Sequence, residues 1–188
     1  GNDLYYAGDD ATILAGGRRV SAVGAALANG FAANALDIDD GYRPIKGHPG
    51  VCVLPPLLAA VERRGGLAGA DFLATLVMGY EVAIRAGLIR HAISTTYHSS
   101  GSWGAIAGAA VAGRVFGFDA ATLRRALGAA EYHAPIAPMK KGINTPNMGK
   151  DSTGWGCMVG MASALMAEQG FTGVEPLFSE APEPAWIA

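Results

Sequence analysis

Charged residues are scarce in this chain, and their scarcity limits the partners that it can bind. They make up 16% of the 188 residues, and the formal net charge is −2. A basic surface that could follow a nucleic-acid backbone is therefore not expected, and nucleic acid is excluded as a predicted partner. Hydrophobic residues reach 51% of the chain. This composition predicts a large buried core or a buried subunit interface.

Cysteine is also rare, and long apolar runs are missing. Cys52 and Cys157 lie far apart and outside any CxxC pattern, which argues against a disulfide or zinc framework and predicts a reducing, cytoplasmic location. Residues 1–10 have neither a cationic start nor an apolar run, so no signal peptide is expected. The apolar run 72–80 is too short to cross a bilayer and is followed at once by Glu81, so no membrane partner is expected.

Several familiar functional motifs are missing as well. The chain has no GxGxxG after a strand, no P-loop, no HExxH and no GxSxG. Its four histidines lack the spacing of a metal-ligand pair. We therefore expect neither a cofactor nor a protein-bound metal.

Helical patterns fill most of the chain and predict an all-α fold. Helices are expected at 22–36, 50–63, 69–93, from 100 or 102 to 117, 119–132 and 152–169. A short extended piece with a Gly-Gly turn is expected at 11–20, and a proline-rich loop at 133–148. Two predicted helices carry glycines four residues apart, so we expect a bundle of large helices packed on small-residue (Ala/Gly) faces. The helix 69–93 is apolar nearly all round and is predicted to be central.

The densest polar cluster lies in residues 34–50, between two apolar helices. It combines Asp37, Asp39 and Asp40 with His48 and two cations. One interpretation is a solvated turn. The other is a site for an anionic substrate, favoured because three carboxylates at the C-terminal end of a helix oppose the helix dipole.

Two further segments carry candidate residues. His98 lies in a hydroxyl-rich loop before a helix start, where backbone N–H groups attract anions; a simple capping loop explains the pattern equally well. Lys150 begins the last helix and has the charge to bind a substrate carboxylate, although a surface lysine is the simpler interpretation. Lys141, in the proline loop, is open to the same two interpretations.

Several segments together resemble the MmgE/PrpD family, which includes 2-methylcitrate dehydratase, cis-aconitate decarboxylase and iminodisuccinate epimerase. The segments that carry the resemblance lie in the family's order along nearly the whole chain. They are GRRVS…AALANG (17–30), ALDIDD (35–40), GHPG (47–50), GYEVAIR (79–85), YHSSGSWGA (97–105), KDSTGWG (150–156) and GFTG (170–173). One departure is Gly41 after the LDxDD motif, where family members often have Thr or His.

The resemblance implies that residues 1–188 are a partial MmgE/PrpD-like helical domain that forms a homodimer. The family's separate α/β lid domain is expected to be absent from this chain. The resemblance also implies catalytic roles for Asp37, His48 and His98, and Lys150 is the best match to the first of the family's lysines. We expect Asp40, Tyr97, Ser99 and Lys141 to bind the substrate.

The activities of this family share one difficult step, the formation or quenching of a carbanion next to a carboxylate. The resemblance therefore implies lyase chemistry on a di- or tricarboxylate by cofactor-free acid/base catalysis, with Asp37 as a base or as the group that orients an imidazole. Dehydration, decarboxylation and epimerisation all remain open from the sequence. The alternative is a catalytically incomplete fragment that serves as a helical dimerisation module.

Overall fold

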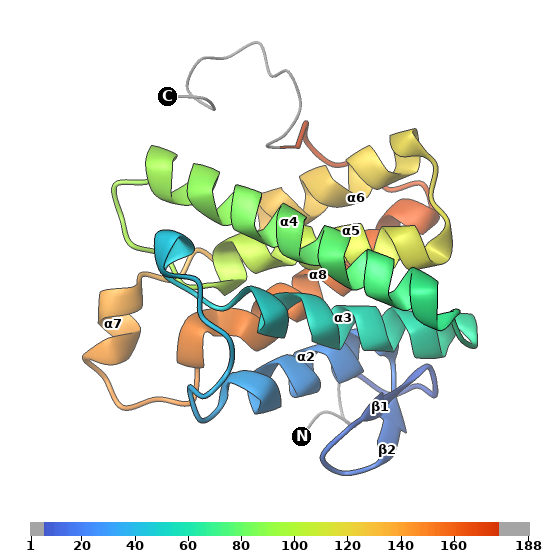
Figure 1. The fold of residues 1–188 in the computed structure, drawn as a ribbon, viewed down its shortest axis with the longest axis horizontal. Coiled ribbons are helices and arrows are strands. Elements are labelled where there is room, and N and C mark those ends of the chain that lie inside the picture. Colours follow the sequence, from blue (N-terminus) through green and yellow to red (C-terminus); the bar gives the residue numbers. More distant parts are fainter. Residues whose placement is uncertain (1–5, 177–188) are drawn as a thin grey trace.

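A small antiparallel hairpin comes before a bundle of helices in the computed structural model, which describes residues 6–176 (Figure 1). The hairpin pairs β1 (Ala11–Ile13) with β2 (Arg18–Val20), as the Gly-Gly turn between them predicts. The α-helices are α2 (Ala22–Asn34), α3 (Pro49–Arg64), α4 (Gly69–Ile93), α5 (Gly101–Phe116), α6 (Ala120–His133), α7 (Met139–Ile143) and α8 (Thr153–Glu168). Two 3-10 turns, η1 (Arg43–Ile45) and η2 (Lys150–Ser152), complete the described elements. The prediction of an all-α class is confirmed.

Local sequence explains where several helices begin and end. The Ser21 side chain accepts a hydrogen bond from the Gly24 N–H at the start of α2, and Asp119 does the same for Thr122 at the start of α6. Gly65 and Gly117 adopt left-handed backbone conformations just after α3 and α5. These glycines end the helices because a side chain is unfavourable in that conformation.

Helix α5 is the centre of the bundle. Every one of its residues is buried except Arg114 and Phe116. It packs against α3, α4, α6 and α8, and its small side chains let these neighbours approach closely. A Cβ atom added at Gly160 of α8 would lie 2.6 Å from the Ala105 carbonyl oxygen of α5. The two backbones therefore touch, as the glycine spacing of both helices predicts.

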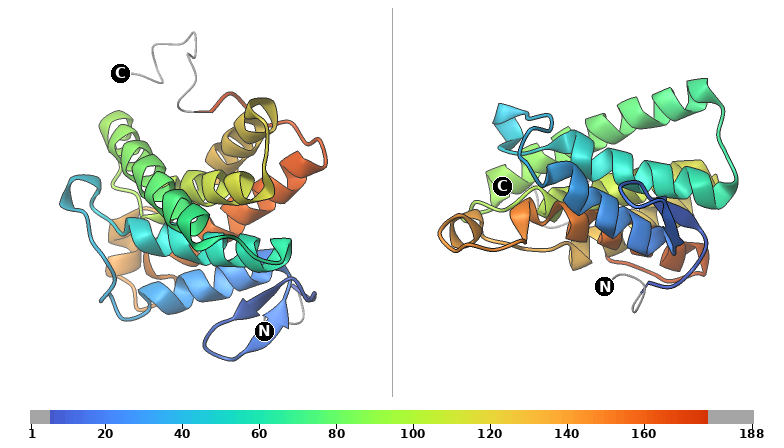
Figure 2. Two further views of the ribbon diagram at one scale, coloured as in Figure 1. Left: turned by 45° about the vertical axis from the view of Figure 1, so that its right-hand side comes forward. Right: turned by 90° about the horizontal axis from the view of Figure 1, so that it is seen from below.

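The prediction that α4 is central is wrong. Its buried residues form one stripe (Thr75, Gly79, Ala83, Ala86 and Gly87), and the helix lies on the outside of the bundle (Figure 2). Large apolar side chains point outward instead, and Leu73 and Val77 are 61% and 65% exposed. Among the described residues, α4 is the one helix that is long enough and apolar enough to cross a membrane, judged by length and composition alone. An apolar outer face of this kind is typical of a surface that something else covers.

Three connecting segments meet at one end of the bundle. They are residues 35–48, residues 94–100 and residues 134–152, and α7 interrupts the last of them where a continuous loop is expected (Figure 1). The polar residues predicted to form a site come from these segments, so the chain topology brings them to the same place.

Candidate active site

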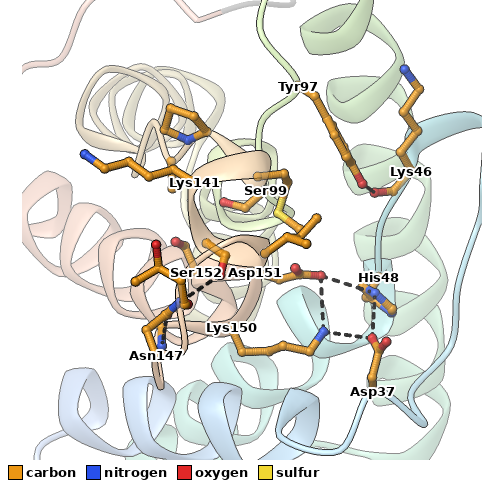
Figure 3. A pocket seen from close by; sticks show the side chains of 17 residues that line it. Asp37, Lys46, His48, Tyr97, Ser99, Lys141, Asn147, Lys150, Asp151 and Ser152 are labelled. Carbon is orange, nitrogen blue, oxygen red and sulfur yellow. Dashed lines mark hydrogen bonds and ion pairs between the residues drawn. The ribbon is translucent and has the colours of Figure 1, made fainter.

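A cavity of about 660 Å³ opens between these three segments, which is the size of an ordinary small-molecule site. The predicted site residues that line it are Asp37, His48, Tyr97, Ser99, Lys141 and Lys150. Lys46, Asn147, Asp151 and Ser152 line it as well (Figure 3). The cavity therefore gathers six of the eight residues that the sequence suggested.

Two aspartates alternate with a lysine and a histidine in a closed ring of four side chains on one wall of the cavity (Figure 3). The Lys150 ammonium lies 2.8 Å from Oδ1 of Asp37 and 3.9 Å from Oδ2 of Asp151. Nε2 of His48 lies 3.5 Å from Oδ1 of Asp37 and 3.2 Å from Oδ2 of Asp151. Each carboxylate thus faces both nitrogen groups, and each nitrogen group faces both carboxylates.

The opposite edge of the His48 ring is fixed by a second set of contacts. Its Nδ1 lies 2.9 Å from the main-chain carbonyl oxygen of Asp40 and 3.1 Å from Oδ2 of Asp39. The side chain of Asp39 is only 6% exposed, and its Oδ2 also accepts a hydrogen bond of 2.8 Å from the buried amide of Asn34. Because a carbonyl oxygen can only accept, Nδ1 carries a hydrogen and Nε2 is the ring atom turned toward the cavity.

The two carboxyl groups that face Nε2 differ in their environment. The hydrogen bond from Lys150 lowers the pKa of Asp37, which is 61% exposed and stays ionised. Burial raises the pKa of Asp151, whose side chain is 7% exposed, although the charges of Lys150 and His48 oppose that rise. Burial by itself lowers the pKa of Lys150, but the hydrogen bond to Asp37 and the nearby carboxylates outweigh it and raise the pKa overall. Lys150 is therefore a permanent cation.

Strained backbone is concentrated at this cavity. Among the described residues, four that are not glycine have positive φ, and all four line the cavity: Asp37 (57°), Lys46 (49°), Asp151 (46°) and Ser152 (52°). The left-handed region is unfavourable for residues with a Cβ atom, at a cost of about 1 kcal/mol or more each. Strain that clusters in this way is typical of a functional site.

The extended conformation of residues 97–99 explains why Tyr97 and Ser99 line the cavity whereas His98 does not. Residues 97–99 pair with residues 137–139 like two short strands: the Ser99 N–H donates to Ala137, the Met139 N–H donates to Tyr97, and His98 bridges to Pro138. Side chains alternate in an extended segment, so Tyr97 and Ser99 face the cavity. His98 is buried on the other side, where burial and the charges of Arg90 and His91 lower its pKa.

The structure gives Asp40 a position outside the cavity lining. Both of its carboxylate oxygens lie 3.1 Å from the Gly50 N–H, at the N-terminus of α3. The carboxylate therefore satisfies a free donor of that helix end. Its main-chain oxygen holds His48, so Asp40 contributes to the site through its backbone.

Three residues of the site, Asp151, Asp39 and Asn34, have no role that sequence patterns assign. Asp151 follows Lys150 directly and resembles an ordinary acidic residue in the first turn of a helix. Asp39 belongs to the recognised acidic cluster, but nothing in its spacing shows that it is buried. Asn34 is fully buried at the end of α2, and a polar residue there next to a polar cluster is the one signal that points to it.

Asp37, Asp39 and His48 also offer ligand atoms within 4.8 Å of one another, a geometry that suits a metal ion. The ammonium of Lys150, 2.8 Å from Asp37, places a positive charge beside that position and disfavours a divalent cation there.

Fold and site together define a helical domain with a cavity that gathers lysine, histidine and aspartate side chains. Lys46, Lys141 and Lys150 line the cavity against Asp37 and Asp151, so its lining carries more positive than negative side chains even with His48 neutral. The chain matches the MmgE/PrpD N-terminal domain over residues 3–183 and belongs to the MmgE/PrpD family.

Curated relatives of the chain carry related names. It is 26% identical over 186 residues to the cis-aconitate decarboxylase-like protein oryM of Aspergillus oryzae, covering 89% of this chain and 36% of that protein. It is 34% identical over 123 residues to the cis-aconitate decarboxylase of Homo sapiens, covering 61% of this chain and 25% of that enzyme. The enzyme of the same name from Aspergillus terreus is 26% identical over 125 residues, 63% of this chain and 26% of that enzyme. The chain thus spans between a quarter and about a third of the length of these relatives.

Proposed function

We propose that the cavity binds a di- or tricarboxylate and supports cofactor-free lyase chemistry at a carbon next to a carboxylate. The observation that carries the proposal is the ring of Asp37, His48, Lys150 and Asp151 on the wall of a cavity rich in lysine. Decarboxylation of cis-aconitate is the first reaction to test, because two of these relatives are named cis-aconitate decarboxylase. Dehydration of a 2-methylcitrate-like hydroxy acid uses the same groups.

The lysines and the imidazole have different roles in such a reaction. Lys150 and Lys141 hold carboxylates of the substrate, and their charge stabilises the electron pair that develops on carbon when a carboxylate leaves. His48, whose Nε2 faces the cavity, moves the proton that replaces it. A well-placed acid or base contributes about 10²–10⁴-fold to rate, which corresponds to roughly 3–5 kcal/mol of barrier. The catalytic role of His98 stays a prediction: its side chain does not line the cavity and would have to act through Tyr97 and Ser99.

The test is turnover of cis-aconitate and 2-methylcitrate by the full-length gene product, followed through the ultraviolet absorbance of the conjugated double bond and through CO₂ release. The variant His48→Gln should lose at least 10²-fold in kcat. Asp71→Asn, a change at an exposed position in the first turn of α4, is the control and should leave turnover unchanged. Equal turnover by wild type and His48→Gln would contradict the proposal. Tight binding of a tricarboxylate without turnover would favour the non-catalytic alternative.

We also infer that a second copy of the chain covers the outer face of α4, giving the homodimer that the family resemblance implies. Exposed residues Leu73, Val77, Glu81, Arg85 and Leu88 follow one another along this face. Val77 and Leu88, and likewise Glu81 and Arg85, lie nearly symmetrically about residue 83. Two antiparallel copies therefore bring an apolar residue against an apolar one and Glu81 against the partner's Arg85. A two-fold interface needs this kind of self-complementarity.

A further inference from the structure

Asp151 has no role in the reaction described so far, yet it is the most enclosed carboxyl group of the cavity wall. Its side chain is 7% exposed, against 61% for Asp37, and its Oδ2 lies 3.2 Å from Nε2 of His48. Asp37 has a cation of its own in Lys150 at 2.8 Å, whereas Asp151 lies 3.9 Å from that ammonium. Of the two carboxyl groups that face Nε2, Asp151 is therefore the closer to His48 and the less neutralised by lysine.

The contact between Nε2 and Asp151 requires a proton. Nδ1 already carries one hydrogen, because it faces the Asp40 carbonyl oxygen and a carboxylate oxygen of Asp39. A neutral ring would then point its Nε2 lone pair at Oδ2 of Asp151, which is repulsive if that oxygen is ionised. Only two arrangements remove the repulsion, either an imidazolium beside a carboxylate or a neutral ring beside a carboxylic acid. Both place one proton between the same two atoms.

We propose that Asp151 and His48 share this proton and act as one acid/base pair, in which Asp151 is a catalytic residue facing the substrate. The inference rests on the proposed function for its chemistry. In a decarboxylation, the bond between the substrate carbon and its carboxylate breaks, CO₂ leaves and the electron pair stays on carbon. The shared proton then forms the new C–H bond, and the pair regains one proton from water.

The surroundings of the pair suit this role. The charged groups that face it are Asp37 and Asp39 from the segment after α2, together with Lys150. Burial raises the pKa of Asp151, so the group takes up a proton more readily than an exposed aspartate. Its left-handed φ of 46° is followed by 52° at Ser152. This turn aims the carboxyl group at His48, and asparagine tolerates the same backbone conformation, so Asp151→Asn is a fair test of the charge alone.

The shared proton is tested without any substrate. Histidine ring nitrogens are followed by ¹⁵N NMR across pH in the wild type, in Asp151→Asn and in the control Asp71→Asn, with His48→Gln used to assign the signal. The wild type and Asp71→Asn should hold the proton at Nε2 of His48 to a higher pH than Asp151→Asn, by about one pH unit or more, because the variant lacks the negative partner. Coincident titrations of His48 in all three proteins would overturn the shared proton, whatever the activity is.

The catalytic role is tested by steady-state kinetics on cis-aconitate. Asp151→Asn should lower kcat by about 10²-fold or more while KM changes only a few-fold, since the lysines still bind the carboxylates. Asp71→Asn should match the wild type. A shifted His48 titration with an unchanged kcat would overturn Asp151 as an acid/base residue. If the wild type turns over no carboxylate, the proposed function fails, and the NMR comparison still decides whether the proton is shared.

Discussion

Replacing Gly160 by alanine should drive α8 away from α5. The new Cβ atom would lie 2.6 Å from the Ala105 carbonyl oxygen and 2.9 Å from both the Ala109 nitrogen and the Gly108 Cα. Ordinary van der Waals contact begins near 3.4 Å, so the helices would have to separate by about 0.8 Å. All three neighbours are main-chain atoms of a buried helix, and no side-chain rotation relieves the contact.

Two energies of opposite sign decide the effect on stability. Alanine is favoured over glycine inside a helix by about 1 kcal/mol. Overpacking of a tight core costs about 1–3 kcal/mol and sometimes more, and a contact against rigid backbone belongs at the upper end. We therefore expect Gly160→Ala to lower the free energy of unfolding by about 1–2 kcal/mol. Gly69→Ala, in the first turn of α4, places its new Cβ atom where no other atom lies within 4 Å, so it should be neutral or slightly stabilising.

Chemical denaturation of both variants, with equal m-values as a check on two-state unfolding, measures the difference. Activity gives a second readout, because the N-terminal end of α8 continues from Lys150 and Asp151. A displacement approaching 1 Å at reacting groups lowers rate by up to about 10²-fold. A Gly160→Ala protein that is as stable and as active as Gly69→Ala would refute the claim that α5 and α8 meet backbone to backbone.

Three further outcomes are expected. Lys150→Met should raise KM for a tricarboxylate about 10–100-fold, since a charge-assisted hydrogen bond contributes about 1.5–3 kcal/mol, and an unchanged KM would remove Lys150 from substrate binding. Burial lowers the pKa of His98 in the folded protein, so below about pH 6.5 the unfolded chain binds a proton at this residue that the folded chain does not. The Tm of the wild type should therefore fall toward pH 5 more steeply than the Tm of His98→Asn. Parallel curves of Tm against pH would contradict this. Val77→Glu should give a monomer in sedimentation, whereas Leu14→Glu, at an exposed position of the hairpin, should not; a dimeric Val77→Glu protein would place the interface elsewhere.

Sequence patterns predicted the helices well because helix-forming signals are local. The bounds expected for 69–93 agree with α4 at both ends, and the helix expected at 119–132 begins at Asp119, whose side chain caps α6. The position of α4 in the bundle was predicted wrongly for a different reason. A helix that is apolar all round must be covered, but its periodicity cannot show whether its own chain or another molecule covers it. Here the inner stripe is made of small residues, and the large apolar side chains lie outside.

The site was predictable to the extent that its residues cluster in sequence. Asp37 and His48 lie in one polar segment, and the structure adds Lys150 at 2.8 Å from Asp37. The orientation of His98 was not predictable, because it depends on pairing with residues about 40 positions further along the chain. A shift of one residue in that pairing exchanges the faces, and spacing within the loop contains no information about it.

The strained turn at Asp151 and Ser152 depends on the close packing of α5 against α8. Left-handed φ at Asp151 and Ser152 persists only where surrounding contacts hold it. Those contacts come from the glycine-rich helix ends: a Cβ at Gly101, in the first turn of α5, would collide with the Ser152 main chain, and one at Gly156 would lie 2.8 Å from the Gly101 Cα. The turn is thus held between two backbones, and it carries Lys150 and Asp151 with it. Side chains fixed in this way meet a substrate without being reorganised first, which is the condition under which positioned charges contribute most to a reaction.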